Sequence, residues 1–398
     1  MQLSRLARNA KPSATLALDA KAKAMAAAGE DVVLFTVGEP DFDTPDNIKQ
    51  ASIRATLAGH TKYTPAAGTM DLRKAIAAKL KGDNGLAYDP RQIIVSNGAK
   101  QALYMMMLAL VDEGDEVLLP APFWVSYADQ AEVCGGRPVV IDCTGAPGFK
   151  LTPDMLRRAI TKRTKLLVIN SPCNPSGIVY TGDELRALVD VALKHDLWII
   201  SDEVYEKLIY DGLKHVSIAA LSKEAYDHTI TVNGVSKTYA MTGWRIGYAA
   251  GPADAINAAG MFQSNLTSGP NTMAQVASVE ALSGDQSSVA EMCAAFARRR
   301  DMIVERLNAI AGVKCVRPQG AFYALPDCRA LLGHTYAGRK VTDSVSLSAA
   351  LLETEKVAVV PGAPFAAEGY LRFSYATSEE KIEEGLARFA HFVGQRDD

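Results

Sequence analysis

The sequence predicts an α/β fold with a large domain, in which a mainly parallel seven-stranded sheet lies between helices, and a smaller α+β domain. Two observations favour this fold class. Between about residues 90 and 250, short runs rich in Val and Ile alternate with helical patterns. From about residue 283 the pattern changes to a long helix, short strands and a final helix. Alternating strands and helices are typical of a parallel sheet that is covered on both faces.

The apolar runs of the first part give the strands of that sheet. The segment between the fourth and fifth runs shows why the intervening residues are predicted as helices. Thr181 and Glu184 form a capping box, and apolar residues follow at positions 185, 188, 189 and 192. The run after it is apolar almost throughout, as expected of a strand buried on both faces. The predicted strands are residues 93–96, 117–119, 138–142, 166–170, 198–201, 229–233 and 245–250.

The smaller domain is predicted from the end of the chain and from a segment near its start. Residues 289–310 form a long helical pattern, in which Arg298, Arg299 and Arg300 are expected to be a solvated stripe. Short strands are predicted at 321–324, 357–360 and 371–375, and the final helix begins at Glu379. We expect an N-terminal arm (1–14), a small domain (15–45 and 286–398) and a large domain (46–285).

Composition excludes several classes of function. The chain of 398 residues has 42 Lys and Arg against 45 Asp and Glu, a net charge of −3, so no nucleic-acid partner is expected. The longest apolar run, 102–111, is too short for a membrane span, which needs about 20 residues. The six cysteines are scattered without a Cys-x-x-Cys pair, which argues against a zinc site and a disulfide framework. We expect no metal, no membrane partner and a cytoplasmic location.

Polar and aromatic residues follow one predicted strand after another. Ligands bind beyond the carboxyl ends of the strands in open parallel sheets, so this rim is the expected site of a small molecule. Asn97-Gly98-Ala99-Lys100 opens a helix whose free N–H groups suit a phosphate. The later strands are followed by Trp124, by Asn174, by Asp202 with Tyr205, and by Ser236 with Lys237, while Arg245 is expected at a strand start.

This set of residues has a consistent chemistry. Gly98, Ala99, Ser236 and Arg245 suit a phosphate, and Trp124 suits an aromatic ring. A buried carboxylate, Asp202, can keep a ring nitrogen protonated. Asn174 and Tyr205 can donate to a phenolate oxygen, and Lys237 can condense with an aldehyde. Together these features describe pyridoxal 5′-phosphate.

The residues resemble the class I, fold-type I pyridoxal-phosphate aminotransferases, and within them the bacterial aspartate aminotransferase subgroup. The resemblance runs over essentially the whole chain, and several motifs in one order make it specific. The motifs are VGEPDFDTP (37–45), TKYTPAAGTMDLR (61–73), SNGAKQAL (96–103), PAPFWVSY (120–127), NSPCNPSG (170–177), SDEVYE (201–206), NGVSKTYAMTGWRIGY (233–248), GAFY (320–323) and LRFSYA (371–376).

The resemblance implies a role for each matching residue. Lys237 matches the catalytic lysine, which forms the Schiff base with the cofactor and later moves a proton at the substrate α-carbon. Arg372 matches the arginine that binds the substrate α-carboxylate, and Gly38 a backbone contact to the same group. The implied cofactor contacts come from Asp202, Tyr205, Asn174, Trp124, Gly98, Ala99, Ser236 and Arg245, and from Tyr63 of the other subunit of a homodimer with shared active sites.

The subgroup also implies a substrate. Its distal carboxylate is bound by a lysine at the phosphate loop and by hydroxyls of a KPSxT segment, which here are Lys100, Ser13 and Thr15. Trp124 and Asn174 are expected to contact the substrate as well. The implied reaction is ping-pong transfer of the amino group from L-aspartate to 2-oxoglutarate, giving oxaloacetate and L-glutamate.

Two departures leave the substrate open. Ala99 stands where glycine is commoner in the subgroup, and residues 268–270 differ from the usual ones near the partner's site. A prephenate or aromatic amino-acid aminotransferase on the same fold is the first alternative, and a pyridoxal-phosphate β-lyase the second. A nucleotide-binding enzyme would need a G-x-G-x-x-G loop after the first strand, which SNGAKQA is not.

Overall fold

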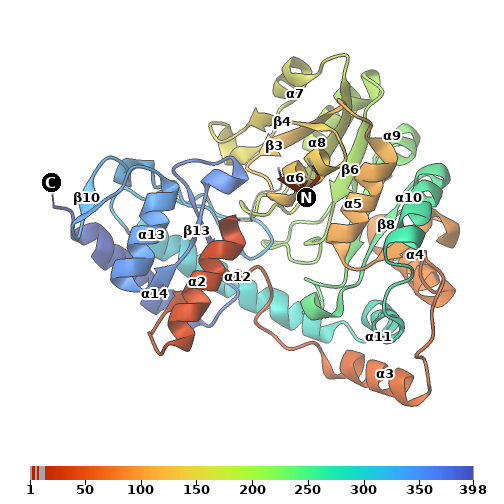
Figure 1. Cartoon of the computed structure of the whole chain (residues 1–398), viewed down its shortest axis with the longest axis horizontal. Helices are drawn as coiled ribbons and strands as arrows, with labels where there is room; N and C mark the ends of the chain where they lie inside the picture. The colour runs from red at the N-terminus through yellow and green to blue at the C-terminus, as the bar shows by residue number, and fades with distance from the viewer. Residues whose placement is uncertain (1, 5–6, 9–13, 398) are drawn as a thin grey trace.

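The computed structural model describes residues 2–4, 7–8 and 14–397, with only the backbone for 14–19. Figure 1 shows two parts side by side, one built around a large sheet and one around the C-terminal helices. The helices are α2 (Ala14–Ala27), α3 (Asp46–Leu57), α4 (Met70–Asn84), α5 (Ala99–Leu110), α6 (Ser126–Val133), α7 (Pro153–Ala159), α8 (Gly182–Lys194), α9 (Lys223–His228), α10 (Ala253–Leu266), α11 (Thr272–Ser283), α12 (Ser287–Asn308), α13 (Ser344–Glu355) and α14 (Glu379–Gly394). In the described residues no helix is long and apolar enough to span a bilayer.

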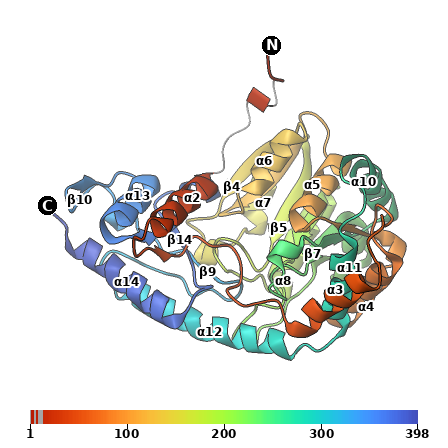
Figure 2. The same ribbon diagram turned by 60° about the horizontal axis from the view of Figure 1, so that its bottom comes forward.

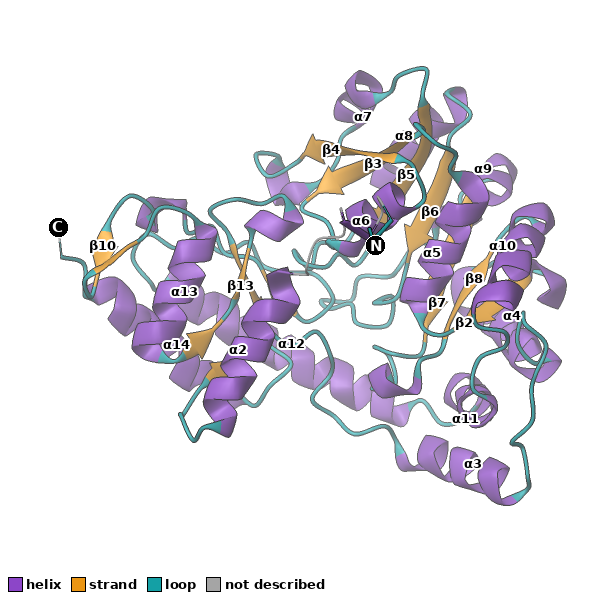
Figure 3. Ribbon diagram, in the orientation of Figure 1, coloured by secondary structure: helices purple, strands orange, loops and turns teal. Residues whose placement is uncertain are grey.

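The large sheet has seven strands in the order β2-β8-β7-β6-β5-β3-β4, and helices flank it (Figure 3). All neighbours pair in parallel except β8, which is antiparallel to both β2 and β7. The predicted fold class is therefore confirmed. The strands are β2 (Ile93–Ser96), β3 (Glu116–Ala121), β4 (Arg137–Asp142), β5 (Thr164–Asn170), β6 (Trp198–Asp202), β7 (Thr229–Gly234) and β8 (Gly247–Ala250).

Burial on both faces explains why the central strands are rich in Val, Ile and Leu. On β5, Leu166 and Val168 pack with α5 and α10 residues on one face, whereas Leu167 and Ile169 pack against α8 on the other. Helix α8 begins as predicted, because the side chains of Thr181 and Glu184 cap each other's backbone N–H groups. The strand–helix alternation thus follows directly from the apolar pattern.

The last predicted strand of the large sheet is shorter than expected. The sequence predicts Arg245 at the start of the 245–250 strand, but β8 begins at Gly247 and Arg245 has a left-handed backbone with φ of 59°. The turn brings the start of β8 against the first residue of α5, so closely that a Cβ on Gly247 would overlap the backbone of Gly98 and Ala99.

The C-terminal part is built from small sheets and three long helices. Strands β13 (Val360–Pro361), β14 (Leu371–Ser374) and β9 (Tyr323–Ala324) form an antiparallel sheet. The N-terminal segment joins this part, because β1 (Val33–Leu34) pairs with β12 (Val357–Ala358). A hairpin of β10 (Thr335–Tyr336) and β11 (Arg339–Lys340) completes it. Figure 2 shows α12 running along the base of both parts. The domain boundaries at 45 and 285 stay a prediction.

The arginine stripe expected on α12 is wrong for two of its three members. Arg298 is exposed, but the Arg299 side chain is only 12% exposed and pairs with Asp41 at 2.7 Å. Arg300 is 1% exposed, and its guanidinium donates to both carboxylate oxygens of Asp211 at 2.7 and 2.9 Å. Long-range pairing allows these charges to be buried.

Candidate active site

A cavity of about 540 Å³ lies at the carboxyl ends of the strands, between the large sheet and the C-terminal part. Strands β5, β6 and β7 end in parallel at one edge, and the antiparallel β8 starts there. The rim predicted from the strand ends is therefore where side chains converge. The predicted residues that line the cavity are Gly38, Ala99, Lys100, Trp124, Asn174, Asp202, Tyr205, Ser236, Lys237, Arg245 and Arg372.

The first turn of α5 and Arg245 form a positively polarised corner of the cavity. Gly98 caps α5 with φ of 86°, a conformation that favours glycine. A Cβ at Gly98 would overlap the guanidinium of Arg245. That guanidinium donates to the carbonyl oxygens of Thr242 and Asn97 at 2.9 and 3.2 Å. The free N–H groups of a helix start and a fixed guanidinium together suit an anion.

Lys237 follows β7 and extends into the cavity. Its ammonium donates to the carbonyl oxygen of Gly38 at 2.6 Å, so it spans from the large sheet to the N-terminal segment. Burial lowers the pKa of Lys237 to about 8, although the carboxylate of Glu39 opposes the shift. Glu39 in turn accepts a hydrogen bond from Thr242 at 2.6 Å. An amine with this pKa is partly neutral near neutral pH, as a nucleophile or a base must be.

Asp202 is the last residue of β6 and is 3% exposed. Burial raises the pKa of its carboxyl to about 6, and two donors oppose that shift. The phenol of Tyr127 donates to Oδ2 at 2.5 Å, and the backbone N–H of Val204 donates to Oδ1 at 3.2 Å. The side chain of Asn170 binds the Asp202 carbonyl oxygen at 3.0 Å. The carboxylate is thus held in one orientation at the base of the cavity.

Arg372 lies on the opposite wall, on β14. Its guanidinium donates to the carbonyl oxygen of Thr36 at 2.8 Å and to Oδ1 of Asn174 at 3.2 Å. It stacks over the rings of Tyr323 and Phe365, with centroid distances of 4.7 and 5.2 Å. A buried guanidinium held in this way is oriented to bind a carboxylate through two parallel hydrogen bonds.

The chain as a whole is similar to proteins of one known family. The model of the family described as aminotransferase class I and II matches residues 30–389. The chain belongs to this aminotransferase family. It is 48% identical to an aspartate aminotransferase of Geobacillus stearothermophilus, with full coverage of both chains. It is 50% identical over 384 residues to an aspartate/prephenate aminotransferase of Cereibacter sphaeroides, covering 96% of each chain.

Solved structures agree with this assignment. The aspartate aminotransferase of Rhizobium meliloti superposes with a TM-score of 0.96 at 44% identity, covering 100% of both chains. The Thermus thermophilus aspartate aminotransferase with maleate superposes with a TM-score of 0.93 at 46% identity, covering 98% of this chain and 100% of the other. The resemblance inferred from the motifs is therefore confirmed at the level of family and fold.

Some predicted residues of the aminotransferase lie elsewhere. The side chain of Tyr63 is at the surface, 98% exposed, and is not among the cavity residues. Gly98 is not among the residues that line the cavity. Ser13 lies outside the described residues. Thr15 lies in α2, but its side chain is not among those described.

The sequence reasoning also missed residues that face the cavity. Tyr127 and Glu39 stand in motifs from which the sequence predicts Trp124 and Gly38, whereas Tyr323 stands in GAFY, to which no role is assigned. The hydroxyls of Tyr205 and Tyr323 lie 2.9 Å apart, so Tyr323 extends the polar wall that Tyr205 begins. Lys23 of α2 lines the cavity as well. Spacing gives no signal for these contacts, since they join segments far apart in the chain.

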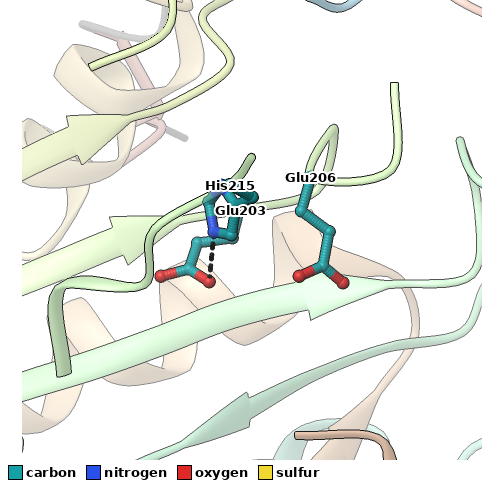
Figure 4. Close-up of side chains that lie close together, drawn as sticks. All are labelled: Glu203, Glu206 and His215. Carbon is teal, nitrogen blue, oxygen red and sulfur yellow. Dashed lines mark hydrogen bonds and ion pairs between the residues drawn. The ribbon is translucent and has the colours of Figure 1, made fainter. Parts of the chain in front are cut away.

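A second polar cluster lies just beyond Asp202, where Glu203 and Glu206 approach His215 (Figure 4). Its ligand atoms lie within 4.8 Å of one another, close enough for a metal ion. Donors of this chain already occupy the carboxylate oxygens, however. Glu203 accepts from His215 at 2.8 Å, from Ser201 at 2.8 Å and from Ser217 at 2.6 Å, while Glu206 accepts from the ammonium of Lys79 and from Asn84. Lys79 supplies the positive charge, so we regard the cluster as structural.

Proposed function

We propose that this aminotransferase carries out ping-pong transfer of the amino group from L-aspartate to 2-oxoglutarate, with pyridoxal 5′-phosphate as its cofactor. The observation that carries the proposal is one cavity that brings together the amine of Lys237, the carboxylate of Asp202 and the guanidinium of Arg372. The names of the relatives from Geobacillus and Rhizobium support aspartate as the donor.

Pyridoxal 5′-phosphate is the cofactor of this family, and the residues present fit it. The corner made by Gly98, the start of α5 and Arg245 suits the phosphate, because it presents N–H donors and positive charge, and a Cβ at position 98 would displace the Arg245 guanidinium. Asp202 suits the ring nitrogen, Trp124 the ring face, and Asn174 with Tyr205 the ring oxygen. Ala99 and Ser236 complete the proposed set of cofactor contacts.

When bound, the cofactor supplies an aldehyde for the amino group and a ring that stabilises negative charge developing at the substrate α-carbon. Residues of the chain itself move the proton and orient the substrate. Lys237 moves the proton at the α-carbon, for which its lowered pKa suits it. Arg372 and the backbone of Gly38 orient the α-carboxylate, and Asn174, bonded to Arg372, lies within reach of the same group.

A dicarboxylate substrate needs a second cation, and Lys100 is the proposed one. Its ammonium lies in the cavity wall, 4.9 Å from the centroid of the Trp124 ring. Burial lowers the pKa of Lys100, Arg245 adds to the shift, and Asp129 opposes it. Ser13 and Thr15 remain proposed partners of the same carboxylate. The Thermus relative was solved with maleate, which is a dicarboxylate, and this supports a distal carboxylate site here.

Lys100→Ala is expected to raise the KM for aspartate about 10- to 100-fold, because one charge-assisted hydrogen bond to the distal carboxylate is lost. The KM for phenylalanine, which has no such carboxylate, should change less than about threefold. Steady-state kinetics with both donors measures the difference.

Lys223→Ala is the matched control, since Lys223 also lies over an aromatic ring, 5.5 Å from the centroid of Tyr226, but outside the cavity. It should leave both KM values unchanged. An equal rise for aspartate and phenylalanine in Lys100→Ala would show that Lys100 does not distinguish the two.

We also propose that the enzyme is a homodimer with shared active sites. Large apolar side chains are exposed on α3, on the loop after it and on α10, as expected of a surface that a second copy covers. Tyr63 belongs to this group and does not line its own cavity, so it is available to the cavity of the other subunit. The exposed side chains are Ile53, Leu57, Tyr63, Met261, Phe262 and Leu266.

Subunit mixing tests the shared site. Tyr63→Ala and Lys237→Ala enzymes, each weakly active or inactive, are dissociated, mixed in equal amounts and reassembled. If Tyr63 serves the other subunit, mixed dimers contain one intact site, and activity should recover to about a quarter of wild type. Light scattering checks the dimer. No recovery from reassembled mixed dimers would place Tyr63 in its own subunit's site or outside catalysis.

Prephenate is a second candidate acceptor, supported by the name of the Cereibacter relative. A β-lyase remains the more distant alternative from the sequence. We also propose a cytoplasmic location, supported by six cysteines that are all unpaired.

A half-reaction titration tests the proposed function. The purified protein, loaded with pyridoxal 5′-phosphate, is mixed separately with aspartate, glutamate, phenylalanine and the amino product of prephenate, and the yellow absorption band is followed. We expect aspartate to remove the band at the lowest concentration and 2-oxoglutarate to restore it. A protein that prefers an aromatic donor would exclude aspartate specificity, and one that takes up no cofactor would overturn the whole proposal.

A further inference from the structure

Tyr127 is part of the cavity wall and contacts the group that the proposed function assigns to the ring nitrogen. It belongs to the first turn of α6 and is 2% exposed. Its ring packs edge-on against Trp124, with centroids 5.4 Å apart and an interplanar angle of 86°. Its hydroxyl donates to Oδ2 of Asp202 at 2.5 Å. One tyrosine therefore touches both the residue proposed to stack on the ring and the residue proposed to bind the ring nitrogen.

The direction of this hydrogen bond is fixed. Burial raises the pKa of the Tyr127 phenol well above its usual value, and the charge of Asp202 adds to the shift. The phenol therefore stays protonated and can only donate to the carboxylate. The backbone N–H of Val204 binds the other oxygen at 3.2 Å. Together the two donors set the plane of the carboxylate and leave further lone pairs for a third donor.

Other ionisable groups face Asp202 from each element around it. Glu203 raises the pKa of Asp202 and Lys237 lowers it. Burial raises the pKa values of Cys173, in the loop after β5, and of Tyr205, and the charge of Asp202 adds to both shifts. Tyr127, in contrast, donates a side-chain hydrogen bond to the Asp202 carboxylate and so favours the charged form of that group.

We propose that Tyr127 is a positioning residue of the aminotransferase: its phenol orients Asp202 and keeps that carboxylate charged for the cofactor's ring nitrogen. The inference rests on the proposed function, because it assumes that Asp202 binds that nitrogen. It assigns to Tyr127 an effect on cofactor affinity and on the spectrum of the bound cofactor, rather than contact with the reacting atoms.

Tyr127→Phe tests the proposal, since it removes the hydroxyl and keeps the ring that packs on Trp124. The dissociation constant of pyridoxal 5′-phosphate is expected to rise about 10- to 100-fold, the loss typical of one hydrogen bond to a charged group. The pH midpoint of the yellow band should shift, because Asp202 ionises less readily without this donor. Fluorescence titration of the cofactor-free protein and absorbance against pH measure the two effects.

A double-mutant cycle separates orientation of Asp202 from packing. In an Asp202→Asn background the carboxylate is absent, so Tyr127→Phe should weaken cofactor binding less than about threefold further. A merely structural tyrosine would instead produce the same loss in both backgrounds, and that result would overturn the proposal.

Tyr180→Phe is the matched control. Tyr180 is also buried, at 4% exposure, but its hydroxyl accepts from the backbone N–H of Leu151 and lies outside the cavity. It should change neither affinity nor spectrum. If wild type binds no cofactor, the proposed function fails; if wild type binds it and Tyr127→Phe matches wild type, only the role of Tyr127 fails.

Discussion

Lys237→Ala is expected to reduce amino-group transfer by about 10⁴-fold or more, because it removes both the nucleophile and the base from the cavity. The fold should remain, since among the described residues the Lys237 ammonium bonds the loop carbonyl of Gly38 alone and its side chain belongs to no apolar cluster. Single-turnover absorbance with aspartate measures the transfer, and circular dichroism measures the melting temperature.

Lys207→Ala controls for the loss of a lysine near the same strands. Lys207 pairs with Asp83 at 2.8 Å and does not line the cavity, so its removal should leave turnover intact. Near-normal turnover of Lys237→Ala would remove Lys237 from the chemistry and with it the proposed mechanism.

The large sheet could be predicted because its signal is local. The central strands are buried on both faces over most of their length, so they are rich in Val, Ile and Leu, and the polar residues that follow mark the point where the strand leaves the core. Asp202 illustrates this: it ends β6, and its position at the cavity follows from the strand alone.

Features that depend on distant partners could not be predicted in this way. Arg300 reads as a surface residue because its sequence neighbours are charged, but Asp211, 89 positions away, makes its burial possible. Arg245 has a left-handed backbone outside the strand, and β8 begins only at Gly247, which packs against the start of α5, about 150 residues away in the chain. In both cases packing between remote elements overrides the local pattern.

The same distinction between local signals and distant contacts applies to the candidate site. Residues directly after a strand were found, whereas Tyr127 and Tyr323 were not, since their importance lies in hydrogen bonds to Asp202 and Tyr205. Tyr127 stands 75 positions from Asp202 in the chain. Both tyrosines stand in motifs that the sequence shows, but the sequence does not show which residues their hydroxyls contact.

Arg372→Lys is expected to lower kcat/KM for all amino donors by about 10²-fold, because an ammonium cannot reproduce the two parallel hydrogen bonds of a guanidinium. The loss should be similar for aspartate and alanine, since every amino acid carries the α-carboxylate. In this respect it differs from Lys100→Ala, which should affect dicarboxylates selectively. Cofactor affinity should stay within about threefold of wild type, because the substitution keeps the positive charge.

Arg300→Lys is the matched control for a buried arginine. Arg300 is also stacked on a tyrosine, 4.9 Å from the centroid of Tyr210, and is bonded to Asp211, but it lies outside the cavity. Its replacement should lower the melting temperature and leave kcat/KM unchanged, because its bidentate pair holds α12 rather than a substrate. Arg372→Lys should instead lower kcat/KM and leave the melting temperature unchanged. If Arg372→Lys loses stability without losing kcat/KM, then Arg372 is a structural residue, and the α-carboxylate must bind elsewhere in the cavity.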